Sequence, residues 1–137
     1  MSDVEKSRIF NTTAYALVAD VVLVLVFAVS GRSSHEESLS VAGVLGTAWP
    51  FLAALALGWL ASRNWRAPLR LWPNGILIWV ITVMGGMILR VASGNTAATA
   101  FIIVATVVLG VFLLGHRALA AFIRRRATHS SPSSRVG

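Results

Sequence analysis

The chain has 137 residues, of which 56% are hydrophobic and only 12% are charged, and its mean hydropathy is +0.75. This composition argues against a soluble globular domain, in which about 25% of residues are charged, and against intrinsic disorder. Lys and Arg total 12 against 5 Asp and Glu, a formal net charge of +7, and the lack of Cys excludes disulfides, thiolate catalysis and cysteine-ligated metals.

Four apolar segments follow one another along the chain, each near the length of roughly 20 residues that a helix needs to cross a bilayer. We expect spans at residues 12–30, 41–62, 75–93 and 97–115, with the last helix continuing beyond the membrane. A backbone in hydrocarbon has to satisfy its own hydrogen bonds, so each segment should be helical. Because short connections make sequential helices antiparallel neighbours, the predicted fold is an all-α, integral membrane, antiparallel four-transmembrane-helix bundle.

The residues outside this bundle form two short ends. Residues 1–11 precede the transmembrane domain, which covers 12–127, and the Ser-rich residues 128–137 should form a disordered tail. A cleaved signal peptide is the alternative for the first segment, since residues 28–30 offer small side chains at a cleavage site. Asp20 interrupts that apolar run, and acids accompany the bases ahead of it, so we expect the segment to be retained as a span.

Basic residues near the segment ends predict the orientation, because cationic flanks stay on the cytoplasmic side. Ten of them lie before the first segment, between the second and third, and after the fourth, whereas only Arg32 and Arg90 lie on the other side. We therefore expect a multi-pass protein of the cell membrane with both termini in the cytoplasm.

A strongly basic chain can also bind nucleic acid. Residues 65–73 interleave arginines with aromatic side chains, and residues 124–126 are three consecutive arginines. Beside spanning helices, both segments are better explained as interfacial anchors that meet anionic lipid headgroups. We therefore expect membrane lipids as partners and no nucleic acid.

Asp20 is the only charge within the first apolar segment. It lies ten residues, about 15 Å, from the end of that segment, at a depth where an acid costs roughly 2.5–3.5 kcal/mol. It should face the bundle interior, where Thr82 and Thr106 lie at similar depth on the third and fourth segments. The carboxyl could take up a proton or cation, or it could hold helices together by hydrogen bonds, and the sequence leaves both interpretations open.

Arg90 completes this candidate intramembrane polar site, about 5 Å from the outer end of the third segment. Its axial offset from Asp20 is about 10 Å, and the Cα–Cβ bonds of both residues lean the same way, which makes direct pairing marginal. In the other interpretation, Arg90 turns to the outer headgroups and complements its helix C-terminus. The depth favours this second interpretation.

Small residues recur at every fourth position of the second segment, which allows another helix to approach closely. This helix-packing stripe should contact the first or third segment, or another subunit. It consists of Ala42, Gly46, Pro50, Ala54, Gly58 and Ser62.

The outer loop holds Arg32 and His35 beside two glutamates. One His with neighbouring Glu residues is too little for a catalytic zinc site, which takes three protein ligands. The chain also carries no nucleophile motif, phosphate loop or dinucleotide fingerprint. We therefore expect no enzyme activity, no catalytic residues, no metal and no cofactor.

Several short motifs together resemble a known family. They are Gly31-Arg32 with His35, Pro50-Phe51, Gly58-Trp59, Gly86 with Leu89-Arg90, and Gly115 before Arg117. This pattern resembles the DUF3054 family, small four-span prokaryotic membrane proteins of unknown function, in which helix one also carries an acid where Asp20 lies. The resemblance covers nearly the whole chain except its two tails. It implies a four-span fold and a membrane location, and it brings no activity.

Three kinds of function are compatible with these features. The first is assembly of the helix bundle, or binding of a small ligand or ion. The second is a small proton-coupled transporter that uses Asp20, similar in outline to small multidrug transporters, although the ten-to-two charge bias departs from that group. The third is an accessory subunit of a larger membrane complex, with a homo-oligomer as a related arrangement.

Overall fold

The computed structural model describes residues 2–34 and 40–130, which form four long helices joined by short connections. Helix α1 spans Asp3–Ser34, α2 spans Val41–Ser62, α3 spans Ile76–Ala92 and α4 spans Thr99–Ser130. The connection between α2 and α3 contains two short turns, η1 (Asn64–Arg66) and η2 (Leu71–Gly75).

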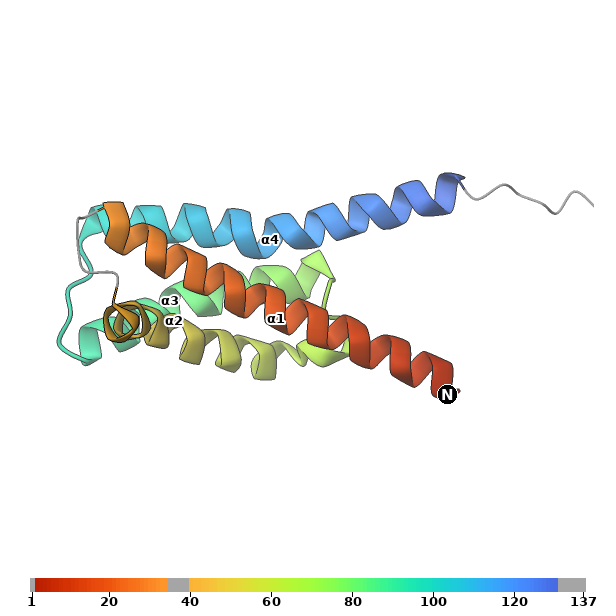
Figure 1. The fold of residues 1–137 in the computed structure, drawn as a ribbon, viewed down its shortest axis with the longest axis horizontal. Coiled ribbons are helices and arrows are strands. Elements are labelled where there is room, and N and C mark those ends of the chain that lie inside the picture. Colours follow the sequence, from red (N-terminus) through yellow and green to blue (C-terminus); the bar gives the residue numbers. More distant parts are fainter. Residues whose placement is uncertain (1, 35–39, 131–137) are drawn as a thin grey trace, which may run out of the picture.

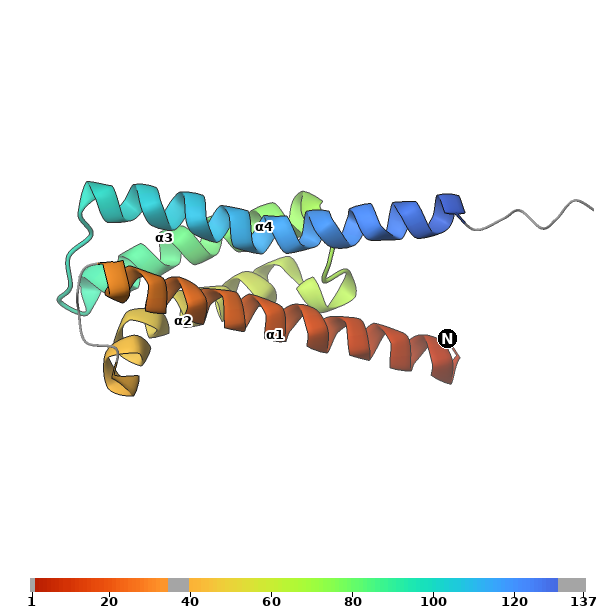
Figure 2. The ribbon, with the colours of Figure 1, turned by 45° about the horizontal axis from the view of Figure 1, so that its top comes forward.

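The helices pack antiparallel into a bundle, as the sequence predicts (Figures 1 and 2). Helix α1 contacts α2 and α4, and α3 contacts the same two helices from the other side. Helices α1 and α4 have 32 residues each, and both project beyond α2 and α3 at one end of the bundle (Figure 2). We call this the α2–α3 end, because α1 begins there, α4 ends there, and the connection between α2 and α3 lies there (Figure 1).

Helices α1, α2 and α4, and α3 together with η2, each provide a stretch that is long and apolar enough to cross a membrane, so the chain is a multi-pass membrane protein by length and composition. These stretches are Asn11–Arg32, Val41–Ser62, Leu71–Ala92 and Thr99–Ala127. The fourth stretch continues well past the predicted end at residue 115, because apolar residues follow Arg117 and prolong the helix. Helix α4 ends at Ser130, so the predicted tail begins inside the helix, and residues 131–137 lie outside the described residues.

Local signals set both ends of α2. The side chain of Ser40 caps its start, because its Oγ accepts a hydrogen bond from the N–H of Gly43 at 3.0 Å. Arg63 ends the helix in the left-handed conformation with φ 49°, which non-glycine residues adopt rarely. The N–H of Arg63 donates to the carbonyl of Leu60 at 3.3 Å, so an otherwise unpaired helix-end carbonyl is satisfied.

The stripe of small residues on α2 is divided between the interior and the surface. Pro50, Ala54 and Gly58 are buried, whereas Ala42 and Gly46 are exposed. Ser62 is half-buried, and its Oγ donates to the carbonyl of Gly58 at 2.7 Å. Half of the stripe therefore packs inside this chain.

Helix α3 packs closely against that buried half. A Cβ added at Gly58 would lie 3.3 Å from the Cα of Ile78, and one added at Gly85 would lie 2.9 Å from the Cβ of Ala54. A Cβ at Gly86 would overlap the ring of Phe51. The two helices can approach this closely because glycine stands at each contact.

Three phenylalanine side chains pack together in the core at the bundle end opposite the α2–α3 end. Phe27 of α1, Phe51 of α2 and Phe101 of α4 have ring centroids 5.3, 6.0 and 6.2 Å apart in pairs. These separations lie in the range in which aromatic rings attract one another. The rings connect three of the four helices, while the polar contacts lie closer to the α2–α3 end.

Candidate functional site

Asp20 lies on the inner face of α1 and has no exposed surface. Ala16 and Val24, one turn away on either side, are also completely buried. Spacings of four residues keep these side chains on one face of a helix. The carboxyl group is therefore fixed in the bundle interior, where its oxygens need hydrogen-bond donors from the protein.

Arg117 of α4 is the principal partner of this carboxyl group. Its Nη1 donates to Asp20 Oδ1 at 2.8 Å and its Nη2 donates to Oδ2 at 2.7 Å. The planar guanidinium matches a carboxylate in this two-bond geometry, which makes the pair both strong and directional. Arg117 is itself completely buried. It also donates from Nη1 to the carbonyl of Leu113 at 2.8 Å and from Nε to that of Pro68 at 3.0 Å.

Two more side chains form hydrogen bonds with the Asp20 carboxylate. The indole Nε1 of Trp59, on α2, donates to Oδ2 at 2.8 Å. The imidazole Nε2 of His116, on α4, lies 2.7 Å from Oδ1. Each carboxylate oxygen thus has two partners, which fills the roughly four acceptor sites of an ionised carboxylate. We call Asp20, Trp59, His116 and Arg117 the Asp20 cluster.

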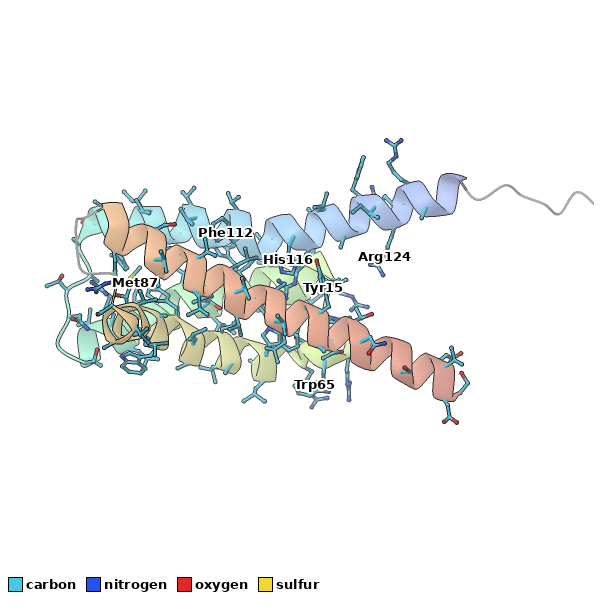
Figure 3. All side chains as sticks on the ribbon, viewed as in Figure 1. Tyr15, Trp65, Met87, Phe112, His116 and Arg124 are labelled. Carbon is cyan, nitrogen blue, oxygen red and sulfur yellow. The ribbon has the colours of Figure 1, made fainter. Side chains whose placement is uncertain are left out.

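His116 connects this cluster to the surface of the bundle, and it lies between α4 and α1 in Figure 3. Its Nε2 is also 3.0 Å from Arg117 Nη1. A protonated Nε2 donates to Asp20, whereas an unprotonated Nε2 accepts from Arg117, and the shorter distance to the carboxylate favours donation. The side chain is 13% exposed, and within the described residues its Nδ1 has no hydrogen-bond partner.

The connection between α2 and α3 belongs to the same network. Asn74 Nδ2 donates to Asn64 Oδ1 at 3.1 Å and to the carbonyl of Ala67 at 3.3 Å. Asn64 Nδ2 donates to the carbonyl of Pro68 at 3.4 Å, which also accepts from Arg117. The Asp20 cluster therefore holds α1, α2, α4 and this connection together.

Helix direction explains why Arg117, and not Arg90, reaches Asp20. Side chains on a helix lean toward its N-terminus. Helix α4 begins at the end opposite the α2–α3 end, so Arg117 leans away from the α2–α3 end, while Asp20 on antiparallel α1 leans toward it. These two side chains converge along the bundle axis. Asp20 and Arg90 lie on parallel helices and lean the same way.

The structure does not bring Arg90 or Thr106 to Asp20. Arg90 Nε donates to the carbonyl of Thr96 at 2.6 Å, and its guanidinium lies 4.4 Å from the ring centroid of Phe101. Thr106 donates to the carbonyl of Ile102 at 2.7 Å, one turn back on its own helix. Neither joins the Asp20 cluster, because other groups occupy the carboxylate and both side chains bond locally.

Thr82 is completely buried, as its predicted place in the interior requires. Its Oγ1 has no hydrogen-bond partner among residues 2–34 and 40–130. It therefore contributes no contact to the Asp20 cluster.

The predicted outer-loop pair is only half described. Arg32 is half-buried, and its Nη1 donates to Thr47 Oγ1 at 3.1 Å. His35 lies outside the described residues. Arg32 and Arg90 both line a cavity of about 180 Å³ at the end opposite the α2–α3 end, so the structure groups these two predicted residues with each other.

The sequence does not mark Trp59, His116 and Arg117 as site residues. Arg117 has the position of a cationic flank, because the uncharged run ends at Gly115. The overlooked signal is that residues 118–123 are apolar again, which places Arg117 inside a longer apolar helix. No comparable signal in the sequence indicates that the indole of Trp59 points toward Asp20.

Chemically, the cluster is a compensated ion pair with one partly exposed imidazole. Arg117 is always charged, so it favours the ionised carboxylate beside it. In the part of the chain that the structure describes, no three His, Asp or Glu side chains gather as metal ligands would. The arrangement can cross-link helices, and it places one partly exposed imidazole, with a buried Nδ1, beside the carboxylate.

Comparison with known families adds one match. A family model with the description "Protein of unknown function (DUF3054)" matches residues 17–120. The matched region contains all four residues of the Asp20 cluster. No curated protein and no solved structure matches the chain.

Proposed function

This chain belongs to the DUF3054 family, and we propose that it is a non-enzymatic membrane protein whose Asp20 cluster clamps the spanning helices into one unit. That unit acts by assembly in the bilayer, with lipids, with copies of itself or with other membrane subunits. One observation carries the proposal: both oxygens of the buried Asp20 are bound by the equally buried Arg117.

The geometry supports a clamp because a buried ion pair is favourable only when its hydrogen bonds are complete. Removing two charges from water costs several kcal/mol per ion, and here Trp59, His116 and two backbone carbonyls complete the hydrogen bonds of the pair. Helices in lipid gain little from hydrophobic attraction to one another, so polar contacts of this kind contribute to their association. The cluster thereby sets the relative positions of α1, α2 and α4.

The outer face of α4 supports assembly in the bilayer. Val104, Val107 and Val111 are each more than half exposed and recur at helical spacing. Such a face suits acyl chains or another spanning helix. With the buried Arg117 left out, nine basic residues against two still support an orientation with both termini in the cytoplasm.

Two substitutions of Asp20 test this proposal in nanodiscs. Asp20→Asn keeps the shape but removes the charge, and Asp20→Leu also removes the hydrogen bonds. We expect both variants to unfold more easily than the wild type and to show a changed oligomer distribution in native mass spectrometry, with the larger effect for Asp20→Leu. Wild-type stability and assembly in both variants would exclude a clamp.

A proton-coupled transporter is the second candidate, and His116 is the observation that favours it. This side chain is 13% exposed and its Nε2 contacts Asp20 directly, so it would give the carboxylate a proton route once its buried Nδ1 meets water. Infrared difference spectroscopy on acidification tests this role. A transporter predicts a protonated-carboxyl band in the wild type that Asp20→Asn removes while the fold stays intact. The clamp predicts no such band from Asp20, because Arg117 keeps the carboxylate engaged.

A further inference from the structure

An open cavity of about 550 Å³ lies at the α2–α3 end, between α1, the connection from α2 to α3, and α4. Three arginines line it, namely Arg66 and Arg70 from the connection and Arg124 from α4. None of the described residues that line it is acidic. We propose that this cavity binds the phosphate group of an anionic ligand, which is either a phospholipid headgroup or free phosphate.

The lining charges fit a phosphate group. A guanidinium is always protonated and presents its donors in a planar fork, which matches phosphate oxygens in a two-bond geometry. All three arginines are exposed, and Arg124 projects from α4 toward the side on which α1 lies (Figure 3). The three arginines come from two segments that are far apart in the sequence, and the fold brings them together at this cavity.

The backbone that carries Arg66 and Arg70 is fixed before any ligand binds. Pro68 lines the cavity, and its carbonyl accepts hydrogen bonds from Arg117 and Asn64. The carbonyl of Arg70 accepts a hydrogen bond from the N–H of Gly75 at 2.9 Å. A site formed in advance loses less conformational entropy when it binds.

Apart from Thr12, the rest of the cavity wall is apolar, and two exposed tryptophans lie on the same connection. Leu69, Leu71 and Ala121 contribute apolar wall. Trp65 and Trp72, on the same connection, are 43% and 74% exposed, and tryptophans mark the boundary between hydrocarbon and headgroups. A phospholipid would place its phosphate at the arginines and its glycerol and first methylenes against this wall. Free phosphate would use the arginines alone.

This site goes beyond the clamp and does not depend on it for its chemistry. The Asp20 cluster is satisfied internally, whereas the cavity arginines are exposed on the outside of the same connection. Pro68 lines the cavity, and its carbonyl also accepts a hydrogen bond from Arg117 of the cluster. The two proposals therefore fail separately. The clamp proposal fails if the Asp20 variants keep wild-type stability, and this proposal fails if the wild-type protein shows no selectivity among the ligands.

The test measures the dissociation constants of short-chain phosphatidylglycerol, short-chain phosphatidylcholine and inorganic phosphate for the detergent-solubilised full chain. Titration calorimetry at about 1 M salt, where the Debye length is about 3 Å, removes the general attraction of surface charge. Arg66→Gln, Arg70→Gln and Arg124→Gln each remove one cavity cation. Arg125→Gln is the matched control, because it removes the same charge from an exposed neighbouring position on α4 that does not line the cavity.

We expect each cavity variant to weaken phosphatidylglycerol binding by about tenfold, the loss of one hydrogen bond between charged groups, and the control to bind as the wild type does. Binding of phosphatidylglycerol but not of inorganic phosphate identifies a lipid headgroup as the ligand. Equal sensitivity of inorganic phosphate to the same substitutions identifies free phosphate.

A further variant, at Ala121, tests the cavity without removing any arginine side chain, so a change in binding cannot come from lost arginine packing. Ala121→Glu places a carboxylate in the cavity wall and leaves every arginine in place, so it should weaken the same binding. The proposal is overturned if Arg125→Gln weakens binding as much as the cavity variants do, or if Ala121→Glu has no effect. It is also overturned if the wild type binds neither phosphatidylglycerol nor inorganic phosphate more tightly than phosphatidylcholine.

Discussion

Replacing Arg117 by methionine is the most informative single perturbation of this bundle. Methionine keeps an unbranched apolar side chain on α4 but removes the charge and all donors. Asp20 would then retain only Trp59 and His116 as partners, with no cation beside it and no exposed surface. The carbonyl of Pro68 would lose its hydrogen bond from Nε at the same time.

The expected cost is about 3–5 kcal/mol, the value for removing one partner of a buried ion pair. This is a large fraction of the 5–15 kcal/mol, roughly, by which folded proteins are stable. Arg117→Lys keeps the charge but cannot form the two-bond geometry, so its loss should fall between that of Arg117→Met and the wild type. Arg125→Met is the matched control on an exposed position of α4, and it should change stability by less than about 0.5 kcal/mol.

Reversible unfolding in mixed micelles, followed by tryptophan fluorescence, measures these differences. Trp59 lies in the cluster and makes the fluorescence sensitive to its opening. If Arg117→Met unfolds within about 1 kcal/mol of Arg125→Met, the ion pair does not hold the bundle as the cost of a broken buried pair requires, and the reasoning is refuted.

Three further predictions follow from individual contacts. Gly58→Leu should destabilise the protein by about 1–3 kcal/mol because it forces α2 away from α3, whereas Gly46→Leu should be tolerated because nothing lies within 4 Å of its added Cβ; equal losses in the same unfolding assay would contradict the packing. Trp59→Phe removes one hydrogen bond to a charged acceptor and should cost about 2 kcal/mol, so an unchanged unfolding free energy would argue against that bond. Reporter fusions at Glu37 and Val136 should lie on opposite sides of the membrane, and activity of both on one side would reject the orientation.

The fold could be predicted from the sequence because few backbone conformations satisfy their own hydrogen bonds inside a bilayer. Four apolar segments of spanning length have to be helical, and their short connections make them antiparallel. The stripe on α2 also indicated close packing, but the spacing alone did not distinguish α3 from a partner subunit. That choice depends on Gly85 and Gly86, which place small residues on the facing helix.

The partners of Asp20 could not be predicted in the same way. Depth in the sequence is measured from an assumed membrane boundary, which ends the fourth span at residue 115 although its helix is expected to continue. Because α4 continues to Ser130, Arg117 lies inside the helix and its long side chain turns back toward Asp20. In a hydropathy profile, a charged residue such as Arg117 indicates the end of a membrane span. Whether that charge instead forms a buried ion pair depends on which helices are neighbours and on the direction in which each side chain leans.

Solid-state NMR on the protein in bilayers tests the central claim most directly, by measuring the distance between the carboxyl carbon of Asp20 and the guanidinium nitrogens of arginine. The chain has only two aspartates, so Asp3→Asn with ¹³C-labelled aspartate leaves one carboxyl signal. With ¹⁵N-labelled arginine, the account predicts dephasing that corresponds to a separation below about 4 Å and that disappears in Arg117→Lys. Absence of dephasing in the Arg117 protein, or dephasing that persists in Arg117→Lys, would contradict the claim that this pair joins α1 to α4.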